Sequence, residues 1–276
     1  MHKATRNTGC IIGCAAALII GGGLLIRRWR RTPLATERVE LLDVPVDPLT
    51  MEAALQRIEE FIRSRQPHHV FTADASGIMR AQEDPELKAI VQQADLITAD
   101  GAGVLIATQL QGRRLPARVS GVDLVEQISA LAASKGYRIY LLGAAEHVVQ
   151  RAAGMLTARY PGLRIAGVHH GYFTAAAEAG IVRDIALAHP DVLFVALGIP
   201  AQEQFIRRNF AQLDVPVMIG VGGSFDVISG QLQRAPRWMQ RTGMEWLFRL
   251  LQQPSRLPRM SALPRFVLAA WKMRRQ

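Results

Sequence analysis

Short apolar runs alternate with longer amphipathic stretches between residues 39 and 230. The apolar runs have the length and composition of buried strands, which we predict at His69–Thr72, Leu96–Thr98, Tyr137–Leu142, Leu163–Gly167, Val192–Leu197 and Val215–Gly220. The stretches between them have helical periodicity and include Met51–Arg65, Asp84–Ala94, Gly121–Ser134, Ala145–Arg159, Ala175–Ala188 and Gln202–Asn209. Such alternation predicts an α/β domain with a Rossmann-like, mostly parallel sheet that has helices on both faces.

Small and polar residues follow five of the predicted strands, at Phe71–Ser76, Thr98–Gly103, Leu141–Ala145, Leu197–Glu203 and Gly220–Asp226. Ligands of open α/β sheets bind beyond the carboxyl ends of the strands. Glycine there lets a phosphate or ribose approach the backbone, and the next helix N-terminus favours an anion. A single such turn is an ordinary strand–helix connection, but their recurrence indicates nucleotide binding. The sequence contains neither a P-loop nor a Gly-x-Gly-x-x-Gly fingerprint.

Three charged residues at these strand ends are candidates for chemistry. Asp100 lies between a strand and a Gly-Ala-Gly turn, where a carboxylate can act as a general base toward a sugar hydroxyl. The alternative is that it caps the next helix, and Asp74 has the same two interpretations. Arg118 precedes a predicted helix and can pair with a phosphate or a carboxylate, or it can be a surface charge.

Charge divides the 276-residue chain into three parts. Residues 1–31 hold six basic residues and no acidic one, and residues 227–276 hold ten basic residues and one acidic one. Although the net charge of the whole chain is +10, residues 32–226 are therefore mildly acidic. Cys10–Ile26 is apolar and uncharged, and the basic cluster Arg27–Arg31 follows it without a cleavage site, which favours a membrane anchor over a signal peptide and places the rest of the chain in the cytoplasm. We predict an anchor at 1–31 and a linker at 32–38.

The C-terminal residues 231–276 are predicted to form a basic, amphipathic appendage. Gly243–Gln253 has a helical apolar face that ends at Pro254, and Phe266–Trp271 is apolar next to a basic end. Basic segments with tryptophan suit a membrane interface, so we expect membrane lipids as partners and no nucleic acid. For Gly243–Gln253, packing against the domain core is an equal alternative, whereas residues 262–276 are expected to contact the membrane.

The sequence predicts neither a disulfide framework nor a metal site. Its two cysteines, Cys10 and Cys14, lie in the apolar N-terminal segment, which indicates a reducing compartment for the main domain. There is no His-x-x-x-His or Cys-x-x-Cys, the central domain has no Asp-x-Asp, and the adjacent His169 and His170 do not have a metal-ligand spacing. We therefore expect no metal and no cofactor.

Nine segments occur in a specific order along residues 40–260: Thr72–Asp74, Ala94–Gly103, Arg118–Asp123, Leu142–Gly143, Gly171–Phe173, Gly198–Glu203, Gly220–Asp226, Ala235–Pro236 and Glu245–Leu250. In this combination they resemble the WecG/TagA/CpsF family of glycosyltransferases, glycosyltransferase family 26. The resemblance implies an inverting, metal-independent hexosyltransferase of cell-surface polysaccharide synthesis. Its donor would be a UDP-sugar and its acceptor an undecaprenyl-diphosphate-linked saccharide, at the cytoplasmic face of the bacterial inner membrane. N-acetylmannosamine, its uronic acid and glucose all remain open as the sugar, and a homo-oligomer is compatible with the sequence.

The resemblance also implies roles for individual residues. Asp100 looks like the family's proposed general base, and Arg249, Arg256 and Arg259 match appendage arginines that help to bind the diphosphate. Substrate-pocket positions of the family are matched by Thr72, Asp74, Arg118, Gln202, Gly222 and Gly223. Many members have asparagine in place of Asp74. Because an ionised carboxylate donates no hydrogen bond, this departure bears on the choice of acceptor.

Two other classes of protein fit parts of the pattern. A nucleotide-binding oxidoreductase or epimerase would share the alternating fold, but the missing dinucleotide fingerprint argues against it. A non-catalytic membrane scaffold would share the basic ends. Binding of NAD would distinguish the first, and failure to transfer or hydrolyse any UDP-sugar would favour the second.

Overall fold

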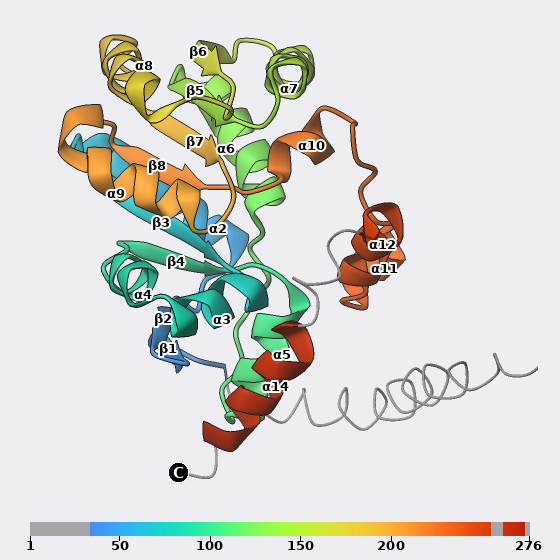
Figure 1. Ribbon diagram of the computed structural model, residues 1–276. Helices are drawn as coiled ribbons and strands as arrows, with labels where there is room; N and C mark the ends of the chain where they lie inside the picture. Colours follow the sequence, from blue (N-terminus) through green and yellow to red (C-terminus); the bar gives the residue numbers. More distant parts are fainter. Residues whose placement is uncertain (1–33, 255–261, 274–276) are drawn as a thin grey trace, which may run out of the picture.

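A six-stranded parallel sheet forms the centre of the computed structural model, which describes residues 34–254 and 262–273 (Figure 1). The strand order is β4-β3-β8-β7-β5-β6, and every neighbouring pair is parallel. All six predicted strands are confirmed, at β3 (His68–Ala73), β4 (Leu96–Ala99), β5 (Arg138–Gly143), β6 (Arg164–His169), β7 (Val192–Ala196) and β8 (Val217–Gly220).

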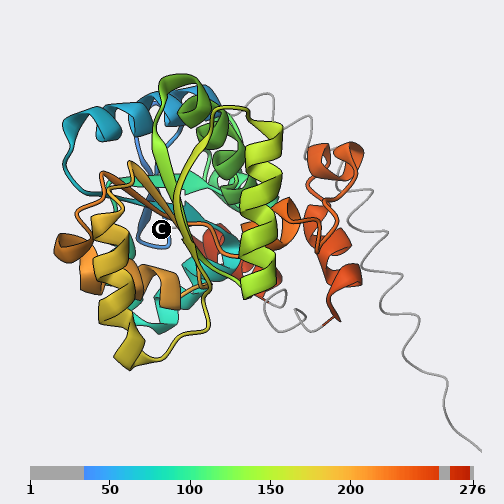
Figure 2. The same cartoon turned by 90° about the horizontal axis from the view of Figure 1, so that it is seen from above.

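Helices cover both faces of the sheet because successive residues of each strand point to opposite sides (Figure 2). In β5, for example, Leu141 packs in one hydrophobic cluster and Leu142 in another. The first face is covered by α2 (Met51–Ser64), α6 (Gly121–Lys135), α7 (Glu146–Arg159) and α10 (Ser224–Ile228). The second is covered by α3 (Ala75–Glu83), α4 (Pro85–Gln92), α5 (Ala102–Leu110), α8 (Ala175–Leu187), α9 (Ala201–Leu213) and α14 (Ala262–Met273). The predicted α/β layer arrangement is therefore confirmed.

The sheet brings together the carboxyl ends of four neighbouring strands. Ala73 of β3 is paired with Ala99 of β4, and Gly220 of β8 is paired with both Phe71 of β3 and Val195 of β7. The segments that follow β3, β4, β7 and β8 therefore begin along one continuous edge. They are four of the five segments in which small and polar residues follow a predicted strand.

Some elements were not predicted. A two-stranded antiparallel hairpin, β1 (Val39–Leu41) and β2 (Val44–Val46), precedes α2, and its turn residues Leu42 and Asp43 have positive φ. Helices α3 and α5 lie directly after the strand-end turns. At the predicted linker, Ala35 is buried and its amide donates a hydrogen bond to the carbonyl of Arg114 at 2.8 Å.

The C-terminal appendage contains α11 (Arg237–Arg241), α12 (Glu245–Gln252) and α14. Helix α12 confirms the predicted helix within Gly243–Gln253. Helix α14 was expected to contact the membrane, yet one of its faces packs on α5 and α3, with Phe266 and Ala270 fully buried. Its other face is turned outward, where Leu268 is 51% exposed and Trp271 is 37% exposed. The packing arises because Phe266 and Ala270 are one helical turn apart and so lie on one stripe.

The predicted N-terminal anchor, residues 1–31, lies outside the described residues. Among the helices of residues 34–254 and 262–273, none has both the length and the apolarity needed to cross a membrane.

Candidate active site

Asp100 lies half-buried at the carboxyl end of β4, at the edge described above. Its amide donates to the carbonyl of Ala73, and its carboxylate oxygen Oδ2 accepts a hydrogen bond from the amide of Gly121 at 3.0 Å. Gly121 is the first residue of α6, so the carboxylate lies at a helix N-terminus, where negative charge is favoured. The N-cap residue of α5, the helix that follows Asp100, is Gly101.

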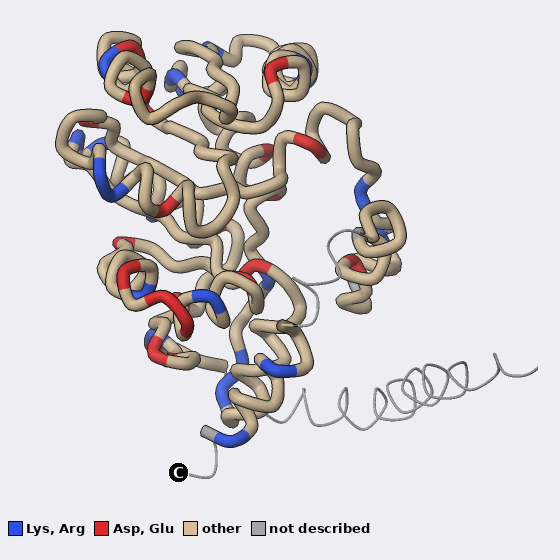
Figure 3. The backbone as a smooth tube through the Cα atoms, in the orientation of Figure 1, with Lys and Arg blue, Asp and Glu red and all other residues tan. Residues whose placement is uncertain are grey.

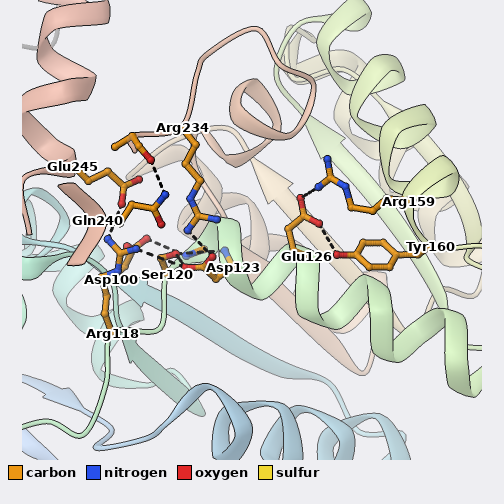
Figure 4. A network of polar contacts seen from close by, with 12 residues as sticks. Asp100, Arg118, Ser120, Asp123, Glu126, Arg159, Tyr160, Arg234, Gln240 and Glu245 are labelled. Carbon is orange, nitrogen blue, oxygen red and sulfur yellow. Dashed lines mark hydrogen bonds and ion pairs between the residues drawn. The ribbon is translucent and has the colours of Figure 1, made fainter. Parts of the chain in front are cut away.

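Arg118 is the centre of a charged network next to Asp100, formed by side chains that point toward one another (Figure 4). Its guanidinium donates a hydrogen bond to Glu245 of α12 at 2.6 Å and lies 3.7 Å from Asp123 of α6. Arg234, from the segment before α11, donates to the other oxygen of Asp123 at 2.5 Å. The arginine predicted to pair with an anion is thus held by two carboxylates of the protein, one of them from the appendage.

The surroundings of Arg118 keep its charge fixed. Burial alone would lower the pKa of the guanidinium, but the hydrogen bond and the charge of Glu245 raise it. The nearby charges of Asp100 and Asp123 raise the pKa of Arg118 further. The guanidinium is therefore a permanent positive charge close to the candidate base.

The appendage meets the catalytic domain directly beside this network. Gly243, between α11 and α12, has φ 74°, and a Cβ atom there would lie 2.7 Å from the Cβ of Ala102. Ala102 is the first residue of α5 and is two residues after Asp100. The start of α12 therefore lies within van der Waals contact of the turn that holds the candidate base.

Thr72 and Asp74, the predicted acceptor-side residues, are both engaged in hydrogen bonds within the protein. The Thr72 hydroxyl donates to the carbonyl of Gly220 at 2.8 Å and thereby joins the ends of β3 and β8. The Asp74 carboxylate accepts from the amide of Gly77 at 2.6 Å and is the N-cap of α3. The capping interpretation of Asp74 is therefore confirmed. Its role in the choice of acceptor stays a prediction.

Gln202, Gly222 and Gly223 lie at the ends of β7 and β8. The side chain of Gln202 is only 1% exposed and accepts hydrogen bonds from the amides of Gly198 and Gly222. Gly223 is the N-cap residue of the short helix α10. These residues come together at the same edge as Asp100 and Thr72.

Arg256 and Arg259 lie outside the described residues, and for Arg249 only the backbone, within α12, is described. Sequence reasoning missed two members of the network, Glu245 and Arg234. The signal for Glu245 was present, because it is the only acidic residue from position 227 to the end of the chain. Among the described residues, no three His, Cys, Asp or Glu side chains are placed to hold a metal ion.

Comparison with known proteins identifies the family of this chain. The model of the glycosyl transferase WecG/TagA/CpsF family matches residues 39–276. The chain belongs to the WecG/TagA/CpsF family. The match includes the whole sheet and the appendage, so both the edge around Asp100 and the α12 contact lie within the matched residues. The chain is accordingly a hexosyltransferase.

Two relatives in this family have names that describe their reactions. A protein of Bacillus spizizenii, named N-acetylglucosaminyldiphosphoundecaprenol N-acetyl-beta-D-mannosaminyltransferase, is 37% identical over 206 residues, covering 75% of this chain and 79% of its own length. A protein of Staphylococcus aureus with the same name is 32% identical over 243 residues, covering 87% of this chain and 95% of its own length.

Proposed function

We propose that this enzyme transfers a sugar from a UDP-sugar to an undecaprenyl-diphosphate-linked saccharide during synthesis of a cell-surface polysaccharide. The observation that carries the proposal is that Asp100 lies close enough to Arg118, at the carboxyl edge of the sheet, for its charge to act on the guanidinium. A carboxylate and a fixed positive charge are the two groups that a sugar transfer needs, one for the acceptor proton and one for the leaving diphosphate.

The proposed reaction is a single displacement. Asp100 accepts the proton of the acceptor hydroxyl as its oxygen bonds to the anomeric carbon, and the bond from that carbon to the nucleotide diphosphate breaks on the opposite side. UDP leaves with the bonding electrons, so the configuration at the anomeric carbon inverts. Arg118 would offset the charge that develops on the diphosphate.

The names of the relatives favour N-acetylmannosamine over its uronic acid and over glucose as the transferred sugar. They also favour an acceptor that ends in N-acetylglucosamine on undecaprenyl diphosphate. We therefore propose N-acetylmannosamine as the donor sugar, with Thr72 and Asp74 on the acceptor side of the site and Gly222 and Gly223 on the nucleotide side.

The enzyme is proposed to work at the cytoplasmic face of the inner membrane, where its lipid-linked acceptor lies. The outward face of α14 supports this placement, because it carries the apolar side chains Leu268 and Trp271 together with the exposed basic residues Arg265 and Lys272. Figure 3 shows where basic and acidic residues lie along the backbone. Arg249, Arg256 and Arg259 would then bind the acceptor or donor diphosphate from the appendage, whose helix α12 already contacts Arg118 through Glu245.

The test uses the full chain in detergent with a panel of UDP-sugars and a lipid-diphosphate-linked N-acetylglucosamine acceptor, with the product detected by mass. We expect product with UDP-N-acetylmannosamine. Asp100→Asn should lower turnover about 100-fold or more with UDP binding retained. The matched control is Asp95→Asn, at the opposite end of β4, where an amide oxygen can still accept the hydrogen bond from the His69 amide. Near-normal turnover of Asp100→Asn would refute the base assignment, and lack of transfer from every UDP-sugar would refute the function.

A further inference from the structure

Three buried polar side chains form a chain beneath the turns that follow β7 and β8. Gln202 and Glu203 belong to the first turn of α9, and His69 belongs to β3. Their exposed fractions are 1%, 0% and 5%. Burying a carboxylate and an imidazole is unfavourable unless each has hydrogen-bond partners, so this arrangement requires an explanation that the reaction proposed above does not supply.

The carbonyl oxygen of the Gln202 side chain joins the two turns. It accepts hydrogen bonds from the amide of Gly198, at 3.2 Å, and from the amide of Gly222, at 3.0 Å. Gly198 follows β7 and has φ 76°, and Gly222 follows β8 and has φ 51°. Both turns therefore have a backbone conformation that favours glycine, and a single amide group sets the distance between them.

Glu203 determines which way the Gln202 amide points. One Glu203 oxygen accepts from Gln202 Nε2 at 2.8 Å, and the other lies 2.5 Å from His69 Nε2. Because the Gln202 oxygen already accepts from two backbone amides, its nitrogen is the atom that donates to Glu203. The nitrogen of Gln202 consequently faces Glu203 and its oxygen faces the turns, and the second Glu203 oxygen is held by the contact with His69.

The sheet is packed directly against this group. A Cβ atom on Gly220, the last residue of β8, would lie 2.4 Å from both Gln202 Nε2 and Glu203 Oε1. The same residue accepts the hydrogen bond from Thr72. No side chain could therefore be added between the end of β8 and the amide without moving one of them.

We propose that Glu203 and His69 are positioning residues for the donor site. They orient Gln202, and Gln202 holds the turns at Gly198 and Gly222 in the relative position that receives the diphosphate of the UDP-sugar. Gln202 therefore acts through the two turns and makes no contact with the substrate. This inference rests on the proposed function, because it assigns the Gly222 turn to the nucleotide.

The first variant to test is Gln202→Glu, in the full chain, with UDP as the probe in a calorimetric titration. The new carboxylate can still accept from Gly198 and Gly222 but has no proton to donate to Glu203, so two carboxylate oxygens face each other in a buried site. We expect UDP affinity to fall about tenfold or more, as for the loss of one hydrogen bond to a charged group.

The decisive variant is the exchange Gln202→Glu with Glu203→Gln. In the exchanged pair, the carboxylate at 202 accepts from both glycine amides and from the new amide at 203, whose oxygen accepts from His69. Every hydrogen bond and the total charge are restored. We expect UDP affinity within about threefold of the wild type, because no net interaction is lost. A role of the Gln202 amide in direct contact with the substrate would not be rescued in this way.

Asn209→Ala is the matched control, since Asn209 is also a buried polar residue of α9 and donates to Glu178 and to the carbonyl of Phe205. It should lower the melting temperature but leave UDP affinity unchanged. Unchanged affinity in Gln202→Glu, or a folded exchange variant as weak as the single variant, would overturn the positioning role alone. A wild-type chain that binds no UDP would overturn the proposed function and this role together.

Discussion

The contact between Arg118 and Glu245 predicts that a charge pair helps to hold the start of α12 on the catalytic domain. The guanidinium and the carboxylate are 2.6 Å apart, and their side chains are only 19% and 12% exposed. At an effective dielectric constant near 20, two charges about 4 Å apart attract by about 4 kcal/mol. Desolvation of the two charges offsets part of this attraction. Exposed pairs contribute at most about 1 kcal/mol to the free energy of unfolding. Loss of one partner of a buried pair costs about 3–5 kcal/mol. We expect a coupling energy of about 2 kcal/mol, between these limits.

The assay is a double-mutant cycle with Arg118→Ala, Glu245→Ala and the double variant, followed by urea unfolding. Tryptophan fluorescence is a selective probe, because the four tryptophans are at 29, 238, 246 and 271, none of them in the predicted catalytic domain. Circular dichroism follows the whole fold. We expect Glu245→Ala to move the fluorescence transition to lower urea while the circular dichroism transition moves much less.

The control cycle uses Arg57 and Glu60, an exposed pair on α2 whose side chains are 56% and 60% exposed. Its coupling energy should be below about 0.5 kcal/mol. If the cycle of Arg118 and Glu245 gives a value as small as this control, then this charge pair does not hold α12 on the catalytic domain.

Two further predictions concern burial. Burial, and then the hydrogen bond and charge of Glu126, raises the pKa of Tyr160 from 10.0 to about 12. The contribution of Tyr160 to the free energy of unfolding should therefore be complete below pH 10 and be lost as the pH rises toward 12. In an ultraviolet titration of the tyrosines, Tyr160→Phe should remove the step near pH 12. Phe266→Ala, in the face of α14 that is fully buried, should destabilise the docked helix by about 3–5 kcal/mol and speed its amide hydrogen exchange, whereas Leu268→Ala should leave that exchange unchanged and weaken binding to anionic vesicles.

The sheet could be predicted because five of its six strands, all except β6, are almost entirely buried and so appear as continuous apolar runs. The hairpin could not, because β1 and β2 have three residues each and Pro45 interrupts the pattern of the second. Helix α5 is apolar almost throughout, without the polar face that marks a helix in sequence. Its position on the sheet explains this composition, since α14 covers the side that would otherwise face water.

For the site, sequence reasoning identified residues better than it identified contacts. Asp100, Arg118 and Gln202 were all expected at the edge of the sheet, and the structure places them there. The hydrogen bond from the Asp100 carboxylate to α6 and the position of Gln202 beneath two turns depend on partners far away in the sequence. The bond between His69 and Glu203, for instance, joins residues 134 positions apart, and no local pattern predicts such a pairing.

The packing of α14 on α5 affects how deletion of the C-terminal appendage should be interpreted. A truncation after Gly243 would remove the segment proposed to touch lipid, and it would also strip an apolar covering from the helix that begins two residues after Asp100. A truncated protein would therefore expose an apolar surface on α5, and the segment around Asp100 would lose packing support at the same time. Substitutions on the outward side of α14 change only the exposed surface that we propose contacts lipid. They therefore test membrane binding without removing the packing on α5, whereas a deletion changes both.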